Sequence, residues 1–307
     1  MILSSTKSIV KIGWKYIPWA ISTLTVAILF KLGAFQPIEN FAYNRFTNLR
    51  SDRPWDERIV IIGIDDVSIE KLGRFPWSRE RYIPLIQKLT SAGASTVTVN
   101  LLWSESSTAD NQLATVMSEN QRVVLAQALG TNGKQLQPVP ILAESAIGTG
   151  QIVEPMDSDG IVRQTQLYIE DTPSLAMATL QAYNLVHGSI PMPDPEHSYG
   201  INWSHRPQKM RQYSFVDVLE DRVPKQNFLN KIVLVGLTAT GSEPLITPFD
   251  QAGASHGIHL HATILQNFLQ QNTLKILPEY WNWGIILFGG TIVAWIMRGC
   301  DLDLIRR

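Results

Sequence analysis

The hydrophobic positions in the first third of the chain predict a strand, a helix and a second strand. Residues 59–64 form an uninterrupted apolar run, mostly β-branched, that stops at Asp65, which is the pattern of a strand buried on both faces. Apolar residues then recur at helical spacing over 82–89, with Ser78 as the expected N-cap. Residues 96–99 read as the second strand. A crossover of this length implies parallel strands, and therefore the start of an α/β sheet.

The same kind of pattern continues toward the C-terminus. Residues 231–236 repeat the pattern of the first strand, so we expect them to lie centrally in the same sheet. Residues 129–159 are rich in Gly, Pro, Asn and Gln, which predicts loops with one edge strand. The other predicted elements are a helix capped by Asp110, strands over 122–126 and 161–169, a helix from Ser174 to His187, short strands over 201–203 and 211–215, a short helix over 215–219 and a helix that begins at Gly257. The predicted fold class is α/β, with a mostly parallel central sheet flanked by helices.

Apolar segments near both ends predict membrane helices on either side of this domain. The uncharged residues 16–30 reach spanning length if Lys15 and Lys31 snorkel. Residues 280–297 carry no charge, have aromatic residues near both ends and are followed by Arg298. Lys7, Lys11 and Lys15 before the first segment and Arg298, Arg306 and Arg307 after the second predict that both termini are cytoplasmic.

Each apolar segment has a competing interpretation. The first resembles a cleavable signal peptide, but Lys31 interrupts the cleavage region and favours an uncleaved anchor. The second could be a buried core helix, but its paired glycines and basic stop favour a span. We therefore expect a cytoplasmic N-terminus and transmembrane anchor over 1–35, an extracytoplasmic domain over 36–278, a transmembrane helix over 279–298 and a cytoplasmic tail over 299–307. Phe41, Phe46 and Leu49 predict a helix that leaves the membrane and packs on the domain.

Composition excludes several classes of protein. The formal net charge of −1 gives no basic surface for nucleic acid. The single cysteine, Cys300, rules out an internal disulfide framework and a cysteine-rich zinc site. With 45% hydrophobic residues, the chain is expected to fold around a packed core without a cofactor.

Three motifs that suggest ligands lack part of their chemistry. The turn 157–160 resembles the start of a calcium loop, but the glutamate that should close such a loop is missing. The loop 236–242 has the glycine spacing of a phosphate-binding loop, but Ser242 occupies the position of the lysine. In the histidine cluster, His261 shares the apolar stripe of its helix whereas His259 falls on the polar face, which we expect to be wet. We predict no metal site.

Several stretches in order support a resemblance to a known family. They are IVIIGIDDVSIEKLGRFPWSRERYIPLIQKLTSAGASTVTVNLL, DSDGIVRQTQLYI, PSLAMATLQ, INW, KIVLVGLTATG, TPF and GIHLHATILQNFL, between two apolar segments. Together they resemble the second type of CHASE domain (cyclases/histidine kinases associated sensory extracellular) over about residues 36–278. The resemblance implies an extracytoplasmic sensor of a bacterial membrane receptor that is coupled to a cytoplasmic kinase or cyclase. Asn100 stands where relatives often have aspartate, and His259 where they commonly have glutamate.

In parallel sheets, ligands bind beyond the carboxyl ends of the strands. The residues predicted there are Asp65, Asp66, Asn100, Thr238 and Ser242, with Arg163 as a possible partner for an anion. The alternative is structural: Asp66 and Asn100 cap and satisfy loop backbone, and Arg163 pairs with Asp157 or Asp159.

We therefore expect a membrane-anchored sensor for a small molecule or an envelope protein, with a kinase or cyclase effector in the same chain or in a partner. A homodimer is expected by resemblance alone. One alternative is a non-catalytic interaction subunit of an envelope complex, and another is a membrane-tethered hydrolase. Gly-x-Ser-x-Gly is absent, so we expect no enzymatic activity. The chain is either a fragment of a receptor or a complete protein that signals through a partner.

Overall fold

The computed structural model describes residues 20–50, 53–130, 133–188, 190–195, 197–242 and 244–299. These residues belong to two compact units, one of Phe46–Lys275 and one made from both ends of the chain, up to Arg45 and from Ile276 on. The predicted basic flanks Lys7, Lys11, Lys15, Arg306 and Arg307, and Cys300, lie outside the described residues.

A seven-stranded sheet organises the unit Phe46–Lys275, with the order β10-β1-β11-β2-β3-β4 and with β5 also paired to β3. All neighbouring pairs are parallel except β3 with β4, so the predicted mostly parallel sheet is confirmed. The strands are β1 (Ile59–Ile64), β2 (Thr96–Leu102), β3 (Val123–Leu129), β4 (Gln135–Leu136), β5 (Gly148–Gln151), β10 (Gln212–Ser214) and β11 (Ile232–Leu237). β11 lies between β1 and β2, which confirms its predicted central position.

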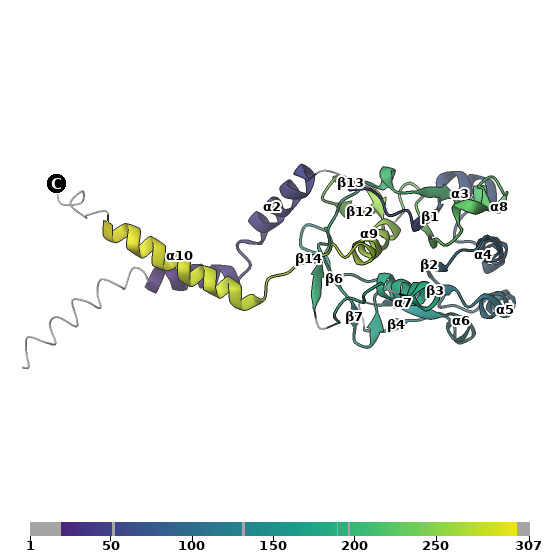
Figure 1. The fold of residues 1–307 in the computed structure, drawn as a ribbon, viewed down its shortest axis with the longest axis horizontal. Helices are drawn as coiled ribbons and strands as arrows, with labels where there is room; N and C mark the ends of the chain where they lie inside the picture. The colour runs from purple at the N-terminus through teal and green to yellow at the C-terminus, as the bar shows by residue number, and fades with distance from the viewer. Residues whose placement is uncertain are drawn as a thin grey trace, which may run out of the picture. The chain divides into compact units, whose positions relative to one another are not determined.

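Helices cover both faces of this sheet (Figure 1). One face carries the larger core, with Val60, Ile62 and Ile64 of β1. The helices on that side are α3 (Asp66–Leu72), α4 (Tyr82–Ser91), α5 (Asp110–Asn120), α6 (Pro140–Ser145) and α8 (Phe215–Leu219). The other face is covered by α7 (Leu175–His187) and α9 (Gly257–Leu269). β1 and β11 are buried on both sides because helices lie above and below them.

Short strands and turns lie around this three-layer core. The additional strands are β6 (Gln164–Gln166), β7 (Tyr168–Ile169), β8 (Thr172–Pro173), β9 (Ser198–Gly200), β12 (Pro244–Thr247), β13 (Asp250–His256) and β14 (Leu274–Lys275). They form the sheets β12-β13, β14-β9-β6 and β7-β8. Three 3₁₀ turns span Arg79–Arg81, Pro207–Lys209 and Lys225–Asn227.

The helices at the two ends of the chain are Ala20–Lys31, α2 (Gln36–Leu49) and α10 (Glu279–Gly299). Within the described residues, no individual helix has both the length and the apolar composition of a membrane span. The pair Ala20–Lys31 and Gln36–Leu49, bent by 68°, meets those two criteria jointly.

Several predicted helix starts need correction. Asp66 begins α3 immediately after β1, a helix that the sequence did not predict, and Asp65 is its N-cap. Ser78 makes no side-chain capping bond. Asp110 does not cap its helix either: it is the first residue of α5, and its carboxylate accepts from the Arg79 side chain and from the backbone N–H of Ser107.

The irregular regions are more structured than predicted. Residues 129–159 contain α6 and two strands that pair with β3. The predicted strand 161–169 is divided into β6 and β7, and β9 ends before the predicted strand 201–203. The hairpin of β12 and β13 was not predicted, because its residues have no regular apolar alternation. In α7, Leu175, Ala178 and Ala182 are buried, whereas Leu185 near the end of the helix is 74% exposed.

The prediction that Phe46 and Leu49 pack on the domain is wrong. Both residues belong to the unit Phe46–Lys275, and each is 63% exposed. The buried side chain of this part of α2 is instead Thr47.

Candidate functional site

Asp65 has a structural role at the carboxyl end of β1. Its Oδ1 accepts hydrogen bonds from the backbone N–H of Ser68 at 2.9 Å and from the hydroxyl of Ser68 at 2.5 Å. The hydroxyl of Ser214, at the end of β10, donates to the same oxygen at 2.8 Å. Asp65 therefore caps α3 and ties it to the neighbouring strand.

Asp66, Thr238 and Ser242 are brought together where β1 and β11 end. The Asp66 carboxylate accepts from the backbone N–H of Thr240 at 3.1 Å and from its hydroxyl at 2.6 Å. The Thr238 backbone N–H donates to the carbonyl of Ile64 at 3.0 Å, and the Ser242 hydroxyl donates to the carbonyl of Ala239. These bonds hold the loop 238–242 against α3, as the structural alternative predicted for Asp66.

A chain of side-chain hydrogen bonds extends this edge to α9. His259 Nδ1 accepts from the backbone N–H of His256 at 3.0 Å, so a neutral His259 carries its proton on Nε2 and donates to Gln212 Oε1 at 3.1 Å. Gln212 Nε2 donates in turn to the hydroxyl of Thr238 at 3.4 Å. The prediction that His259 lies on a wet face is wrong, since it is 3% exposed.

Burial also determines the charge of these histidines. It lowers the pKa of His259 to about 4, with a smaller contribution from the neighbouring His256. Burial alone lowers the pKa of His261 to about 4. Both imidazoles are therefore neutral near pH 7. His261 is 3% exposed, as its predicted place on the apolar stripe of the helix implies, and its Nδ1 has no hydrogen-bond partner among the described residues.

Asn100 belongs to β2, where it pairs with Gly236 of β11. β2 is longer than predicted, so Asn100 lies within the strand and not after it. Its Oδ1 is buried and, within the described part of the chain, accepts no hydrogen bond. Its Nδ2 faces the start of α9, 3.9 Å from the place that a Cβ on Gly257 would occupy.

Arg163 lies in a different structural element from the other predicted site residues. It donates to Asp157 Oδ2 at 2.6 Å and to Asp159 Oδ2 at 2.7 Å, with its side chain 6% exposed. The hydrogen bonds from Arg163 lower the pKa of Asp159. The pairing predicted as the structural alternative is confirmed, and Arg163 clamps the turn that ends at Gly160.

A separate cavity of about 200 Å³ lies beside the end of α2. Its polar lining comes from Thr47, Arg50, Arg53, Asn202 and Ser204. Trp203 and Phe249 complete the lining. These residues come from three segments that are far apart in the sequence, and sequence reasoning singled out none of them as ligands.

Asn202 is the organising residue of this cavity. Its Oδ1 accepts from Arg50 at 3.1 Å, and its Nδ2 donates to the carbonyl of Asn272 at 3.0 Å. The backbone N–H of Asn202 donates to Asn267 Oδ1 at 2.7 Å, and Asn267 Nδ2 donates to the backbone carbonyl of Asn202 at 3.1 Å. The side chain is therefore held in one orientation.

His205 is bonded to two residues that line the cavity, Arg53 and Ser204. Its Nε2 bonds to the carbonyl of Arg53, and its Nδ1 lies 3.0 Å from the hydroxyl of Ser204. Because Nε2 faces a carbonyl, Nε2 carries the proton and Nδ1 accepts. Burial lowers the pKa of His205, so the ring is neutral at pH 7.

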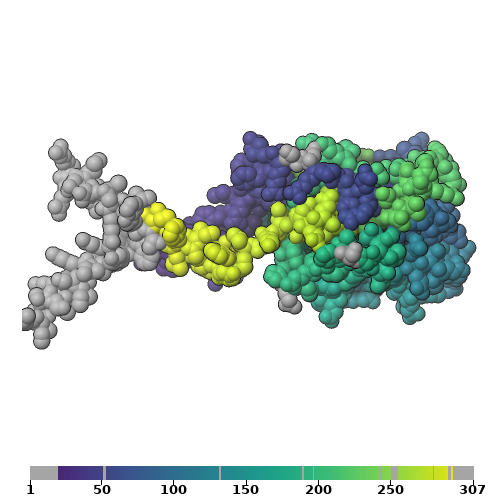
Figure 2. Space-filling view, viewed as in Figure 1, coloured from purple at the N-terminus to yellow at the C-terminus, as the bar shows by residue number. Residues whose placement is uncertain are grey.

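The segment that enters the unit also packs against its C-terminal part. Arg58 donates to the carbonyl of Leu269 at 3.2 Å, and Gln270 donates to the carbonyl of Pro54 at 3.4 Å. Figure 2 shows the same proximity, with blue atoms of the entering segment beside yellow atoms of the C-terminal part. One lining residue of the cavity, Asn202, is bonded to both of these parts, at Arg50 and at Asn272.

The resemblance stated from the sequence is confirmed by comparison with protein families. The family model for the CHASE2 domain matches residues 21–298. No curated protein and no solved structure matches the chain. Because the family match covers most of its length, the chain belongs to the CHASE2 family, a family of sensory extracellular domains found in signalling receptors.

Proposed function

We propose that this chain is the membrane-anchored input domain of a bacterial signalling receptor. In this proposal, the anchor (1–35) and the helix (279–298) cross the cytoplasmic membrane, and residues 36–278 lie on the periplasmic side. Both termini, including the tail 299–307, are cytoplasmic. A small molecule or an envelope protein is sensed outside, and a kinase or cyclase in cis or in trans responds inside.

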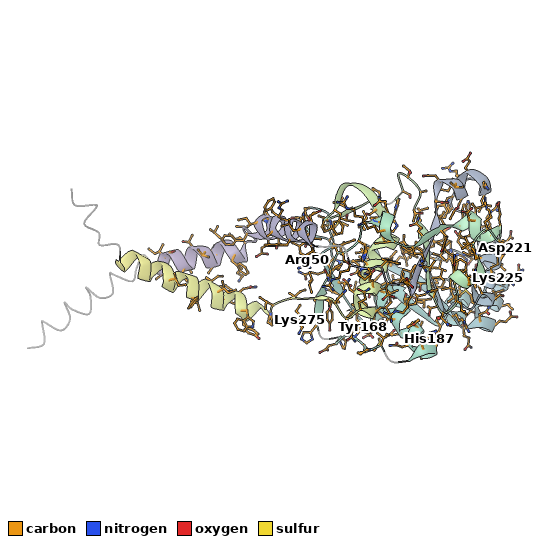
Figure 3. All side chains as sticks on the ribbon, turned by 45° about the horizontal axis from the view of Figure 1, so that its top comes forward. Arg50, Tyr168, His187, Asp221, Lys225 and Lys275 are labelled. Atoms are coloured by element: carbon orange, nitrogen blue, oxygen red, sulfur yellow. The ribbon has the colours of Figure 1, made fainter. Side chains whose placement is uncertain are left out.

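The observation that carries the proposal is that the α/β unit has its entry and its exit at one end. Arg50 marks the entry and Lys275 the exit, and Figure 3 shows both at the same end of the unit, opposite Asp221 and Lys225. Asn202 bonds to Arg50 and to Asn272, three residues before Lys275. A sensory domain between two membrane helices requires this arrangement, because both connections must return to one surface.

A signal would pass through these two connections. A ligand that favours one arrangement of the entry relative to the exit shifts the equilibrium toward it. The paired Gly289 and Gly290 allow close approach of α10 to another helix, which fits a homodimer.

We propose no catalytic role for the chain. Ser204 and His205 are within bonding distance, but Nε2 of His205 faces the carbonyl of Arg53. In a Ser-His-Asp triad, a carboxylate occupies that position, where it orients the imidazole and stabilises its charged form. This geometry argues against the tethered-hydrolase alternative.

Cysteine labelling tests the topology. Lys225 is exposed at the end of the unit away from the entry and exit, so Lys225→Cys in a Cys300→Ser background should react with a membrane-impermeant maleimide in intact spheroplasts. The native Cys300 should react only after the membrane is permeabilised. Labelling of Lys225→Cys only after permeabilisation would reject the proposed orientation.

One observation favours the alternative of a non-catalytic interaction subunit. Ile141, Val153 and Met156 are 39%, 43% and 64% exposed in and next to the segment 129–155. A contiguous surface of exposed apolar side chains favours protein contacts. Val153→Glu with Met156→Glu should then abolish association with an envelope partner while leaving the unfolding temperature unchanged. Unchanged association would reject this alternative.

A further inference from the structure

We infer that the cavity beside the end of α2 binds a small anion through a carboxylate or a phosphate group. The inference rests on the proposed sensor function and deepens it, because it names the chemical class of the sensed ligand. The lining residues that carry it are Arg50, Arg53 and Asn202.

Arg50 and Arg53 carry positive charge that no described carboxylate neutralises. Four other arginines of the unit, Arg58, Arg79, Arg163 and Arg222, each form an ion pair with an aspartate. Within the described part of the chain, neither Arg50 nor Arg53 has a carboxylate at ion-pair distance, and both are exposed at the cavity. Two guanidinium groups at one small cavity favour an anion, since each can donate two parallel hydrogen bonds to a carboxylate or phosphate.

Hydrogen bonds already order the polar wall of the cavity. Asn202 is 4% exposed, and its hydrogen bonds to Asn267 and Asn272 hold it in place. It positions Arg50 with one hydrogen bond, which leaves the other N–H groups of that guanidinium available. A site whose donors are positioned before binding loses less entropy when the ligand arrives.

The size and the apolar wall limit the ligand further. A cavity of about 200 Å³ is smaller than the range of roughly 300–1,000 Å³ that is usual for drug-sized ligands. Trp203 and Phe249 are the apolar residues of the lining, next to which a short carbon chain could lie. Inorganic phosphate, a short dicarboxylate or the phosphate of a phospholipid head group all satisfy this chemistry.

The site also lies at the connection that the sensor mechanism uses. An anion that bridges Arg50 and Arg53 would fix the entering chain next to Asn202, which is bonded to the leaving chain at Asn272. Occupancy of the cavity would therefore change the relation between the two connections.

Direct binding to the full chain tests the inference. The chain in nanodiscs of zwitterionic lipid is titrated calorimetrically with inorganic phosphate and, separately, with succinate. We expect saturable binding of at least one of the two, and a loss of at least about tenfold in affinity, or ~1.4 kcal/mol, in Arg53→Met. Arg53→Met should fold normally, because only the Arg53 backbone is used in the bond to His205. Arg50→Met should weaken binding likewise, whereas Arg74→Met, which removes an exposed arginine outside the cavity, should leave it unchanged.

Nanodiscs that contain phosphatidylglycerol distinguish the sources of the anion. If phosphatidylglycerol in the nanodiscs abolishes binding of phosphate or succinate to the wild type, the ligand of the cavity is a lipid head group. If binding persists, the ligand is a free anion. Both outcomes support the inference when binding depends on Arg53. Absence of binding in every arm, or equal binding by wild type, Arg53→Met and Arg50→Met, would overturn it. The labelling experiment on Lys225→Cys is independent of this result, so the sensor proposal can survive its failure.

Discussion

Arg50 donates a hydrogen bond of 3.1 Å to the side-chain oxygen of Asn202, a residue 152 positions later in the chain. The amide nitrogen of the same asparagine donates to the carbonyl of Asn272 at 3.0 Å. One buried side chain thus connects the segment that enters the α/β unit to the segment that leaves it. Asn202 is therefore in direct contact with both connections of the unit.

Asp65 should matter more for stability than Asp66. Asp65→Ala removes the acceptor of the α3 cap and leaves the buried hydroxyl of Ser68 with one partner fewer, so we expect a loss of about 2 kcal/mol in the free energy of unfolding. Asp66 is exposed, and Asp66→Ala should cost less than about 1 kcal/mol. Urea denaturation of the full chain measures both. Equal losses would contradict the assignment of Asp65 as the structural cap.

The buried ion pair of Arg79 and Asp110 should be among the most sensitive contacts of the unit. The two side chains are only 8% and 10% exposed, so Asp110→Asn leaves a guanidinium in the interior without its counter-charge. We expect a loss of about 3–5 kcal/mol in the free energy of unfolding.

Lys71 and Glu220 provide the matched control for this pair. They lie 3.5 Å apart with exposures of 42% and 48%, and Lys71→Met should change the free energy of unfolding by less than about 1 kcal/mol. If Asp110→Asn were as mild as Lys71→Met in urea denaturation, the pair would not be buried as described.

Gly150 should tolerate no side chain. A Cβ at this position would lie 2.6 Å from the Cα of Leu175 and 3.0 Å from the Cβ of Ala178, so Gly150→Ala must displace α7 from the sheet. We expect a loss of about 1–3 kcal/mol. Gly148 is in the same strand with nothing within 4 Å of the corresponding position, and Gly148→Ala should fall within about 0.5 kcal/mol of the wild type. Thermal unfolding of the two variants separates these outcomes.

Glu154 should make stability fall as the pH rises. Burial raises the pKa of Glu154 to about 8, above the ordinary value of 4.5 expected in the unfolded chain. Between pH 4.5 and about pH 8, Glu154 is protonated in the native state and ionised in the unfolded state. The contribution of Glu154 to the free energy of unfolding is therefore full below pH 4.5, falls as the pH rises and is lost by about pH 8. The slope is at most about 1.4 kcal/mol per pH unit.

Glu154→Gln removes this titration. The free energy of unfolding of Glu154→Gln should therefore rise relative to the wild type as the pH increases from 5 to 8. The lowered pKa values of His259 and His261 have the opposite effect: below pH 6.5, stability falls as the pH falls. Both histidines are present in the wild type and in Glu154→Gln, so their effect cancels in the difference. Glu144→Gln, at an exposed position of α6, should run parallel to the wild type throughout. Parallel curves for Glu154→Gln as well would show that Glu154 is solvated.

Sequence patterns predicted the elements whose stability comes from apolar burial. β1 and β11 were identified because a strand between two helical layers must be apolar on both faces. β5 was not, because its sequence Gly-Thr-Gly-Gln has little strand propensity. Gly150 of this strand is required for the close approach of α7. That tertiary contact produces no periodic pattern in the sequence.

For the candidate site, too, the sequence predicted some contacts and missed others. Topology correctly placed Asp66, Thr238 and Ser242 near one edge, and the pairing of Arg163 with the aspartates of its own turn was anticipated. The polar face of α9 was predicted to be exposed to solvent, because polar side chains are usually exposed. In the structure, His259 and Gln266 face polar partners from distant segments, Gln212 and His205, and are buried. Contacts of that kind depend on residues that no local pattern connects.

The insertion of β11 between β1 and β2 has a consequence for how the protein acquires its structure. β1 and β2 do not pair with each other, because β11, residues 232–237, lies between them and pairs with both. Neither strand can therefore form this pairing until more than two-thirds of the chain has left the ribosome. Pairings of such high contact order form slowly and leave apolar strand edges unprotected in the meantime. Premature termination before Ile232 would deprive the nascent chain of its middle strand, and the product would be a substrate for chaperones and proteases instead of a smaller sensor.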